Sequence, residues 1–144
     1  MNDESTDMLR RILKNASHSL TQPRLLVCEA LAESGPVSMR ELCTAVEDEI
    51  DRATVYRTIE LFEKLGLVER IYIGWKYKVE LSDVLSHHHH HLACTNCGRL
   101  IAMSDEADIE RLIDAIARRH GFRQQQHQLE VRGICADCSK KHAS

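Results

Sequence analysis

The stretch His87-His88-His89-His90-His91-Leu92-Ala93-Cys94-Thr95-Asn96-Cys97 joins a run of histidines directly to a Cys-x-x-Cys pair. A second such pair, Cys135 and Cys138, lies near the C-terminus. Neutral imidazole and thiolate are the side chains that bind zinc and its neighbours in the transition series. Expression tags also contain histidine runs, but they stand at a terminus, and this run is internal. The two cysteine pairs have the spacing of one tetrahedral site of four sulfurs, so the sequence predicts a metal-binding protein.

The histidine run itself is predicted to form a β-strand. Successive side chains of a strand point to opposite faces, which places His87, His89 and His91 on one face and His88 and His90 on the other. One strand can therefore supply ligands to two different metal sites.

The length and composition of the chain indicate its domain size and its cellular location. A chain of 144 residues, 43% of them hydrophobic, suits one ordinary domain or two small ones. The sequence has no apolar run long enough to span a membrane, and its acidic N-terminus lacks the layout of a secretory signal, so a cytoplasmic location is expected. There, cysteines are expected as ligands and free thiols rather than disulfides. Cys28 and Cys43 have no partner at ligand spacing and are expected to be small apolar residues.

Charge and histidine content point to two halves with different tasks. The net charge of −3 excludes a broad polycation, so binding to nucleic acid would require a local basic face. Eight of the nine histidines follow residue 82, which assigns metal binding to the second half. The predicted organisation is a first domain over residues 1–82, a hinge over 83–86 and a metal-binding domain over 87–144.

The first half has the pattern of a winged helix. Helices are predicted over residues 4–16, from Pro23 to the Gly35-Pro36 break, in a short segment after Ser38, and over 52–65. Thr21 is the expected N-cap of the second helix, and Ser38-Met39-Arg40-Glu41 is a capping box in sequence. Two alternating runs, 67–73 and 75–81, joined at Gly74, predict a β-hairpin.

The helix over residues 52–65 is the predicted recognition helix, whose first turns enter the major groove of DNA. A tyrosine offers an apolar surface for a thymine methyl group, and an arginine offers a fork for guanine or phosphate. An arginine in the first turn of the second helix can bind a phosphate, together with the N-terminus of that helix. The alternative is an ordinary solvated helix face. The candidate DNA-binding residues are Arg24, Arg52, Thr54, Tyr56 and Arg57.

The second half is predicted to be a small α+β unit. It contains further strands over residues 100–103 and 128–133, and a helix over 105–119 with an apolar side formed by Ile109, Leu112, Ile113 and Ile116. The exposed sheet edges and the apolar helix would be covered most simply by a second copy of the chain. A two-fold homodimer would also match a palindromic site in double-stranded DNA.

Taken together, these residues resemble the ferric uptake regulator family, which includes iron-, zinc-, manganese- and peroxide-sensing repressors. The resemblance implies an N-terminal winged helix-turn-helix domain, a C-terminal α/β dimerisation domain, and metal-dependent repression of metal-uptake and homeostasis genes. The matching pieces follow the family's order through nearly the whole chain: Leu20-Thr21-Gln22-Pro23-Arg24, Ala53-Thr54-Val55-Tyr56-Arg57, the histidine run into Cys94-x-x-Cys97-Gly98, His120-Gly121, His127 and Cys135-x-x-Cys138.

The resemblance assigns the metal ligands residue by residue. The structural Zn²⁺ site is matched by Cys94, Cys97, Cys135 and Cys138, in agreement with the closed sulfur shell expected of a structural zinc. A second site within the C-terminal domain is matched by His88, His90, Glu110 and His127. For Glu110 and His127, the alternative is a surface carboxylate and a solvated imidazole.

The resemblance places the regulatory site at the hinge, where His89, His91 and Glu80 match its ligands. The iron-sensing pattern adds a histidine in the loop before the third helix, but this chain has Ser34-Gly35-Pro36-Val37-Ser38 there. Some zinc-sensing relatives use a ligand at the start of the wing, where Glu69 stands, although an exposed strand glutamate is the alternative. Two oxygens and two nitrogens suit Fe²⁺, Mn²⁺ or Zn²⁺, and the sequence leaves the choice open.

Two other functions remain as alternatives, a zinc buffer or chaperone and a metal-dependent hydrolase. The chain lacks the His-Glu-x-x-His pattern of metalloproteases and the Gly-x-Ser-x-Gly turn of serine hydrolases, so no enzymatic activity is expected. Zinc buffering or zinc transfer would not require a winged helix.

Overall fold

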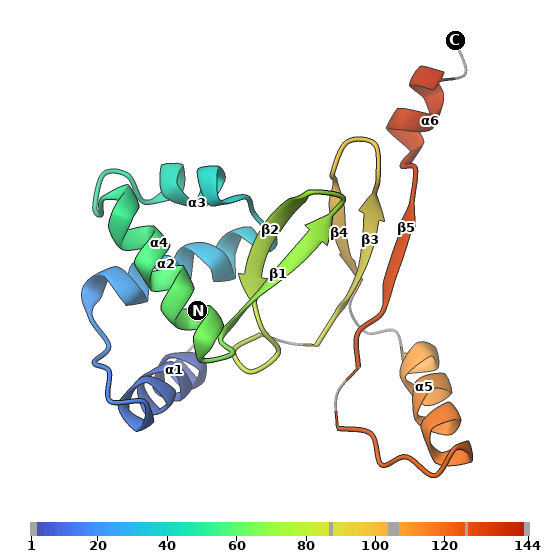
Figure 1. The fold of residues 1–144 in the computed structure, drawn as a ribbon, viewed down its shortest axis with the longest axis horizontal. Coiled ribbons are helices and arrows are strands. Elements are labelled where there is room, and N and C mark those ends of the chain that lie inside the picture. The colour runs from blue at the N-terminus through green and yellow to red at the C-terminus, as the bar shows by residue number, and fades with distance from the viewer. Residues whose placement is uncertain (1–2, 87, 104–106, 126, 143–144) are drawn as a thin grey trace. The chain divides into compact units, whose positions relative to one another are not determined.

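The computed structural model of the chain describes residues 3–86, 88–103, 107–125 and 127–142, and within them it shows an α+β protein (Figure 1). The chain divides into two compact units, Met1–His87 and His88–Ser144. None of the described helices is long and apolar enough to cross a membrane.

The first unit has the predicted order of helices followed by a hairpin. The wing strands pair antiparallel, with Glu69 opposite Glu80, and Gly74 takes a φ of 64° at the turn between them. Gly66 takes a φ of 68° just after the helix that precedes the hairpin and helps to end that helix. The elements are α1 (Asp3–Asn15), α2 (Gln22–Ser34), α3 (Met39–Ala45), α4 (Arg52–Lys64), β1 (Val68–Ile73) and β2 (Lys76–Leu81).

Side-chain caps set the starts of two helices in this unit. The hydroxyl of Ser38 accepts a hydrogen bond from the Glu41 amide at 3.2 Å, and the Glu41 carboxylate accepts one from the Ser38 amide at 2.7 Å. The predicted capping box is therefore confirmed. Asp51 caps α4 by accepting from the Thr54 amide at 3.0 Å. Thr21 occupies the N-cap position of α2, but its side chain makes no capping hydrogen bond.

Replacing Ser38 with alanine is expected to lower the free energy of unfolding by about 1 kcal/mol, because the first turn of α3 loses its cap. The backbone amide of Ser38, then its hydroxyl, lower the pKa of Glu41. A lowered pKa gives stability that is complete above the unfolded pKa and lost as pH falls through the folded one, so the deficit should shrink in acid. Urea titrations at neutral and acidic pH test this, with exposed Ser19→Ala as the control.

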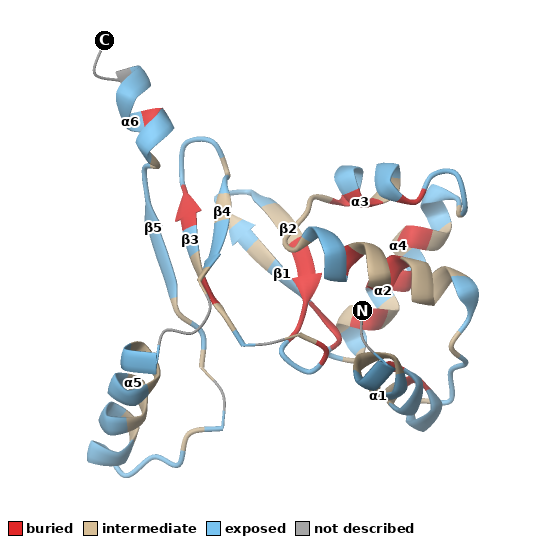
Figure 2. Ribbon diagram, turned by 180° about the vertical axis from the view of Figure 1, so that it is seen from behind, coloured by how far each residue is buried: buried red, intermediate tan, exposed pale blue. Residues whose placement is uncertain are grey.

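The hydrophobic core described in the chain lies in the first unit. One cluster of buried residues takes members from all four helices and the hairpin, and the red segments of Figure 2 follow these elements. The apolar stripe of α4 is buried at Val55, Ile59 and Phe62, whereas Leu65, just after the helix, is only half-buried. Cys28 is fully buried in this cluster, as expected, and burial raises the pKa of its thiol to about 12.

The second unit contains a mixed three-stranded sheet in the order β4-β3-β5. The central strand β3 runs antiparallel to β4 and parallel to β5. Of the two helices, the short α6 was not anticipated from the sequence. The elements are β3 (His90–Cys94), β4 (Leu100–Met103), α5 (Ala107–Arg119), β5 (Glu130–Gly133) and α6 (Ala136–His142).

The strand predicted from the histidine run starts later than expected. It begins at His90, so the expectation of a strand is wrong for His88 and His89, and His87 lies outside the described residues. The ladder with β4 begins at the pair His90 and Met103, and the ladder with β5 begins at the pair His91 and Glu130.

The second unit buries few of its own apolar side chains. None of the described side chains of α5 is buried, and the helix lacks red segments in Figure 2. Leu112 is 59% exposed on α5, and Val131 is 49% exposed on β5. The buried residues in the described part of this unit are Ala93, Cys94, Cys138 and the polar His90. Hydrophobic burial within one chain therefore contributes little to the stability of this unit.

Candidate metal centres and nucleic-acid interface

The four predicted zinc-binding cysteines converge at one end of the second sheet. The parallel pairing of β3 with β5 sets Cys94 opposite Gly133, so the chain segments carrying the two Cys-x-x-Cys pairs leave the sheet side by side. Each of the four cysteines offers a sulfur within 4.8 Å of the others, and the sulfurs of Cys97 and Cys135 are 3.8 Å apart. Sulfurs bonded to one tetrahedral zinc at about 2.3 Å lie about 3.8 Å apart, so the cluster fits this ion.

Backbone amides stabilise the thiolate form of one cysteine in this cluster, which is the form that binds a cation. The Cys135 amide donates to the sulfur of Cys94 at 3.3 Å, and this bond, with those from the amides of Cys97 and Asn96, lowers the pKa of Cys94 to about 6. The hydrogen bond with Asn96 lowers the pKa of Cys138, but the bond with Cys135 and burial outweigh it and raise that pKa to about 11. Neighbouring thiolates repel one another, so the ionisation of one thiol makes the ionisation of the next less favourable. A bound divalent cation would offset this repulsion.

A second cluster joins the even-numbered histidines to α5 and to the loop before β5. The Nε2 atom of His90 lies 2.9 Å from Oε1 of Glu110, and Nε2 of His127 lies 3.2 Å from the same oxygen. Nε2 of His88 lies 3.1 Å from Nε2 of His127. All four predicted ligands of the second site are therefore brought together within one unit.

The electrostatics of this cluster also favour a cation. Burial raises the pKa of Glu110, but the hydrogen bond with His90 and the charges of His127 and His88 outweigh it, so the pKa is lowered overall. His90 is only 2% exposed. Three imidazole nitrogens and one carboxylate oxygen form a donor set that suits Zn²⁺ and related transition metals.

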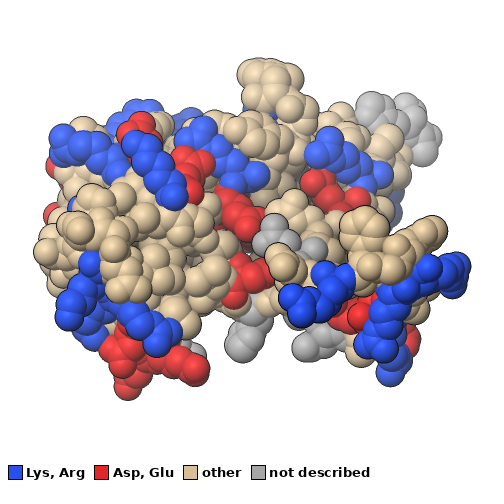
Figure 3. Space-filling model, turned by 60° about the horizontal axis from the view of Figure 1, so that its bottom comes forward, with Lys and Arg blue, Asp and Glu red and all other residues tan. Residues whose placement is uncertain are grey.

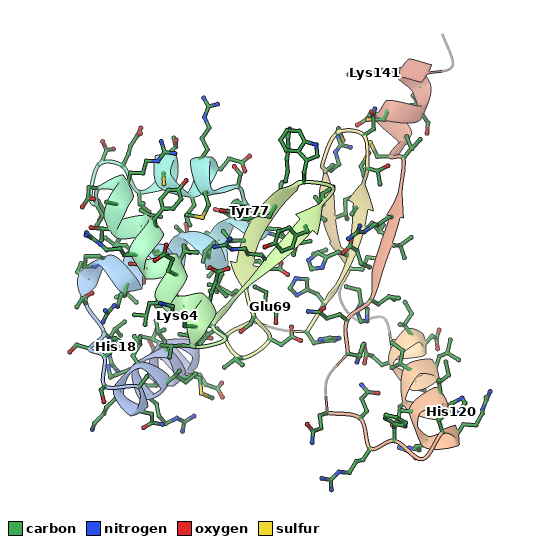
Figure 4. The ribbon with its side chains drawn as sticks, viewed as in Figure 1. His18, Lys64, Glu69, Tyr77, His120 and Lys141 are labelled. Atoms are coloured by element: carbon green, nitrogen blue, oxygen red, sulfur yellow. The ribbon has the colours of Figure 1, made fainter. Side chains whose placement is uncertain are left out.

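The four residues predicted for the regulatory site form two pairs, one in each unit. The rings of His89 and His91 lie 4.8 Å apart between centroids, on the face of the run opposite to His88 and His90. Glu69 and Glu80 face each other across the wing strands and so share one face of the hairpin, where Figure 4 marks Glu69. Like charges directly opposite in a sheet destabilise it, and a bound cation would relieve this repulsion.

The predicted DNA-contacting residues lie at the starts of α2 and α4. Arg52 and Arg57 are exposed, and Tyr56 is half-buried, with its ring centroid 5.5 Å from the Arg52 guanidinium. The Thr54 hydroxyl donates to Asp51 at 2.6 Å and accepts from Arg57 at 3.1 Å, so it is engaged within the helix. Arg24 donates to the Ser19 carbonyl.

The basic residues on the face shown in Figure 3 are interspersed with acidic ones and do not form one continuous positive surface. On this face the charges agree with the net charge of −3, which excludes a broad polycation.

Two contacts near the metal clusters had no signal in the sequence. The guanidinium of Arg99 pairs with the carboxylate of Asp137 at 2.7 Å beside the cysteines. The side-chain amide of Gln124 lies 2.6 Å from Nδ1 of His127. Arg99 and Gln124 belong to no spacing motif. Asp137 lies between Cys135 and Cys138, but nothing in the sequence indicates that it pairs with Arg99.

Comparison with known proteins supports the same interpretation over most of the chain. The model of the ferric uptake regulator family matches residues 15–132. The ferric uptake regulation protein of Escherichia coli (strain K12) is 40% identical over 140 residues, which cover 91% of this chain and 93% of that protein.

Solved structures agree with the sequence comparison. The Vibrio cholerae ferric uptake regulator has a TM-score of 0.67 at 36% identity and covers 88% of this chain and 98% of its own. The ferric uptake regulator of Pseudomonas aeruginosa, solved with manganese, has a TM-score of 0.70 at 29% identity, covering 86% and 95%. A winged helix, clustered cysteines and histidines, and these similarities lead to one conclusion: the chain belongs to the ferric uptake regulator family of metal-responsive transcriptional regulators.

Proposed function

We propose that this protein is a cytoplasmic, homodimeric repressor that binds a palindromic operator in double-stranded DNA when a regulatory metal ion is bound. The opposed carboxylates of the wing support this proposal, because Glu69 and Glu80 lie opposite each other just before the hinge and would supply half of a cation site. Only nine positions separate Glu80 from His89 along the chain. An ion bound by both pairs would fix the angle between the two units.

The proposed regulatory ligands are Glu69, Glu80, His89 and His91, and the proposed ions are Fe²⁺, Mn²⁺ and Zn²⁺. This oxygen and nitrogen donor set is compatible with each of them. Zn²⁺ in the cysteine cluster would have a structural role, since four sulfurs leave no open coordination position. The second cluster, with His88, His90, Glu110 and His127, would bind a further ion. No step in this proposal requires catalysis.

The homodimer is proposed from the apolar surface of the second unit. Leu112 and Ile116 on α5, together with Ile101 and Val131 on the outer strands, are at least 44% exposed. Exposed apolar groups of this kind are stabilised when a second chain covers them. Two-fold symmetry would then present two α4 helices to the two half-sites of an operator.

The proposal is tested by selecting duplexes from a random pool with the metal-loaded protein and measuring their mobility shift. A repressor of this kind selects a palindrome and shifts it as a dimer, with parallel titrations of Fe²⁺, Mn²⁺ and Zn²⁺ ranking the ions. A zinc buffer would select no sequence. A hydrolase would act on ester or peptide substrates when loaded with zinc, and would need no duplex.

Replacing Arg57 with alanine is expected to weaken binding to the selected duplex roughly 5- to 150-fold, the loss of one specific side-chain contact worth about 1–3 kcal/mol. Fluorescence anisotropy at several salt concentrations measures it. A phosphate contact lowers the salt slope by about 1, whereas a base contact leaves the slope unchanged. Lys64→Ala is the matched control, because it removes a positive charge from the other end of α4 (Figure 4). Equal effects of both substitutions would contradict the assignment of Arg57.

A further inference from the structure

The loop that follows α5 places a glutamine against the histidine cluster. The amide of Gln124 lies 2.6 Å from Nδ1 of His127, and the other amide atom, Oε1, is buried without a hydrogen-bond partner among the described groups. On the opposite side of the same ring, Nε2 faces Oε1 of Glu110 at 3.2 Å. His127 therefore directs one ring nitrogen into the cluster and the other towards Gln124.

The contacts of His127 with Gln124 and with Glu110 both depend on which ring nitrogen carries the proton. A neutral imidazole has one N–H and one lone pair, and a metal ion needs the lone pair. If Nε2 binds the ion, Nδ1 must carry the proton and needs an acceptor. The amide oxygen of Gln124 is such an acceptor, because a half-turn of the amide plane exchanges its oxygen with its nitrogen.

We propose that Gln124 is a positioning residue for the second metal site: its amide oxygen accepts the Nδ1 proton of His127 and so directs the Nε2 lone pair at the ion. This inference rests on the second site proposed above. The amide acts in both states of the site. Without an ion its NH₂ group can donate to Nδ1, and with an ion its oxygen accepts from Nδ1, so the ring keeps its orientation throughout.

The half-buried position of Gln124 supports this role. The neighbouring Gln125 is exposed and has the same side chain, so it separates a specific contact from a general effect of glutamine in this loop. Loss of such an outer hydrogen bond to a ligand histidine typically weakens metal binding about 10- to 100-fold.

Four substitutions in the chain of 144 residues test the role of Gln124. Co²⁺ is the probe, and its absorption at the second site is identified as the signal that Glu110→Ala removes. Gln124→Leu removes the acceptor and should weaken Co²⁺ binding at this site about 10- to 100-fold. Gln124→Glu keeps an acceptor but cannot donate when ionised, so it should restore at least the wild-type affinity. Gln125→Leu should have no effect.

A second readout follows the proton itself. In the Zn²⁺-loaded wild type, a ring N–H resonance of His127 should exchange slowly with water, and Gln124→Leu should make this exchange fast. Circular dichroism checks that each variant is folded.

Wild-type affinity in Gln124→Leu, or an equal loss in Gln124→Leu and Gln124→Glu, would overturn the proposed role of Gln124 and leave the second site standing. Absence of any Co²⁺ signal that depends on Glu110 would overturn the site and this inference together. The DNA-binding measurements above are independent of both outcomes.

Discussion

Replacing Cys135 with serine is expected to release the structural zinc and unfold the second unit while the first unit stays folded. The core of the first unit is formed by its own residues, from Leu9 to Leu85. The second unit has no comparable core in its described part, so the metal must supply much of its stability. Structural zinc sites contribute about 10–16 kcal/mol of apparent binding free energy in small domains. This is as large as the whole stability of many domains, about 5–15 kcal/mol.

Zinc stoichiometry and limited proteolysis of the full-length chain measure this effect. In the Cys135→Ser variant we expect one zinc fewer per chain and rapid cleavage after residue 88, with a protected fragment from the first unit. Cys43→Ser is the control, because it makes the same chemical change at a half-buried cysteine outside the cluster. A Cys135→Ser protein that lost its zinc and yet resisted cleavage as the wild type does would show that the second unit is stable without the metal.

Replacing His91 with glutamine is expected to abolish the increase in DNA affinity that the regulatory metal produces. An ion alters the balance between two arrangements only through its different affinity for them. Coupling between two sites is typically about 1–3 kcal/mol, so the metal should raise DNA affinity about 5- to 150-fold in the wild type. Without the His91 imidazole, only His89 remains to bind the ion in the second half of the proposed site. The ion should then bind too weakly to couple the two halves, so metal-loaded and metal-free protein should bind DNA alike.

Anisotropy of a labelled duplex, with and without the regulatory metal, measures this coupling. His120→Gln provides the matched control, because it removes an exposed histidine at the end of α5, outside the clusters found among the described residues (Figure 4). The assignment of His91 would fail if the two variants responded to metal in the same way.

Much of the fold could be predicted from local patterns in the sequence. The capping box at Ser38 and the turn at Gly74 each depend on neighbours a few residues away, and each was predicted correctly. The later start of β3 could not be predicted in this way. It depends on where the partner strands begin and end, and alternation in one strand carries no information about its neighbours.

The candidate sites, like the fold, could be predicted only in part from local sequence patterns. The spacing of the doubled Cys-x-x-Cys pairs indicated the cysteine cluster, and strand alternation placed His88 and His90 on one face. Glu110 and His127 were assigned to the second cluster only through the resemblance to the family. Residues around the clusters carry no such spacing. Gln124 contacts His127 through the shape of a loop, and Arg99 meets Asp137 only after the sheet and α6 have formed.

One exchangeable ion, distinct from the structural zinc, is proposed to control DNA binding. The most direct measurement is the affinity of the wild-type protein for its selected duplex over a range of buffered free Mn²⁺, with the zinc content of the cysteine cluster checked at each point. We predict that affinity rises about 5- to 150-fold as the ion binds, while one zinc per chain is retained throughout. An affinity that stays constant over the whole range, with the structural zinc in place, would contradict the account.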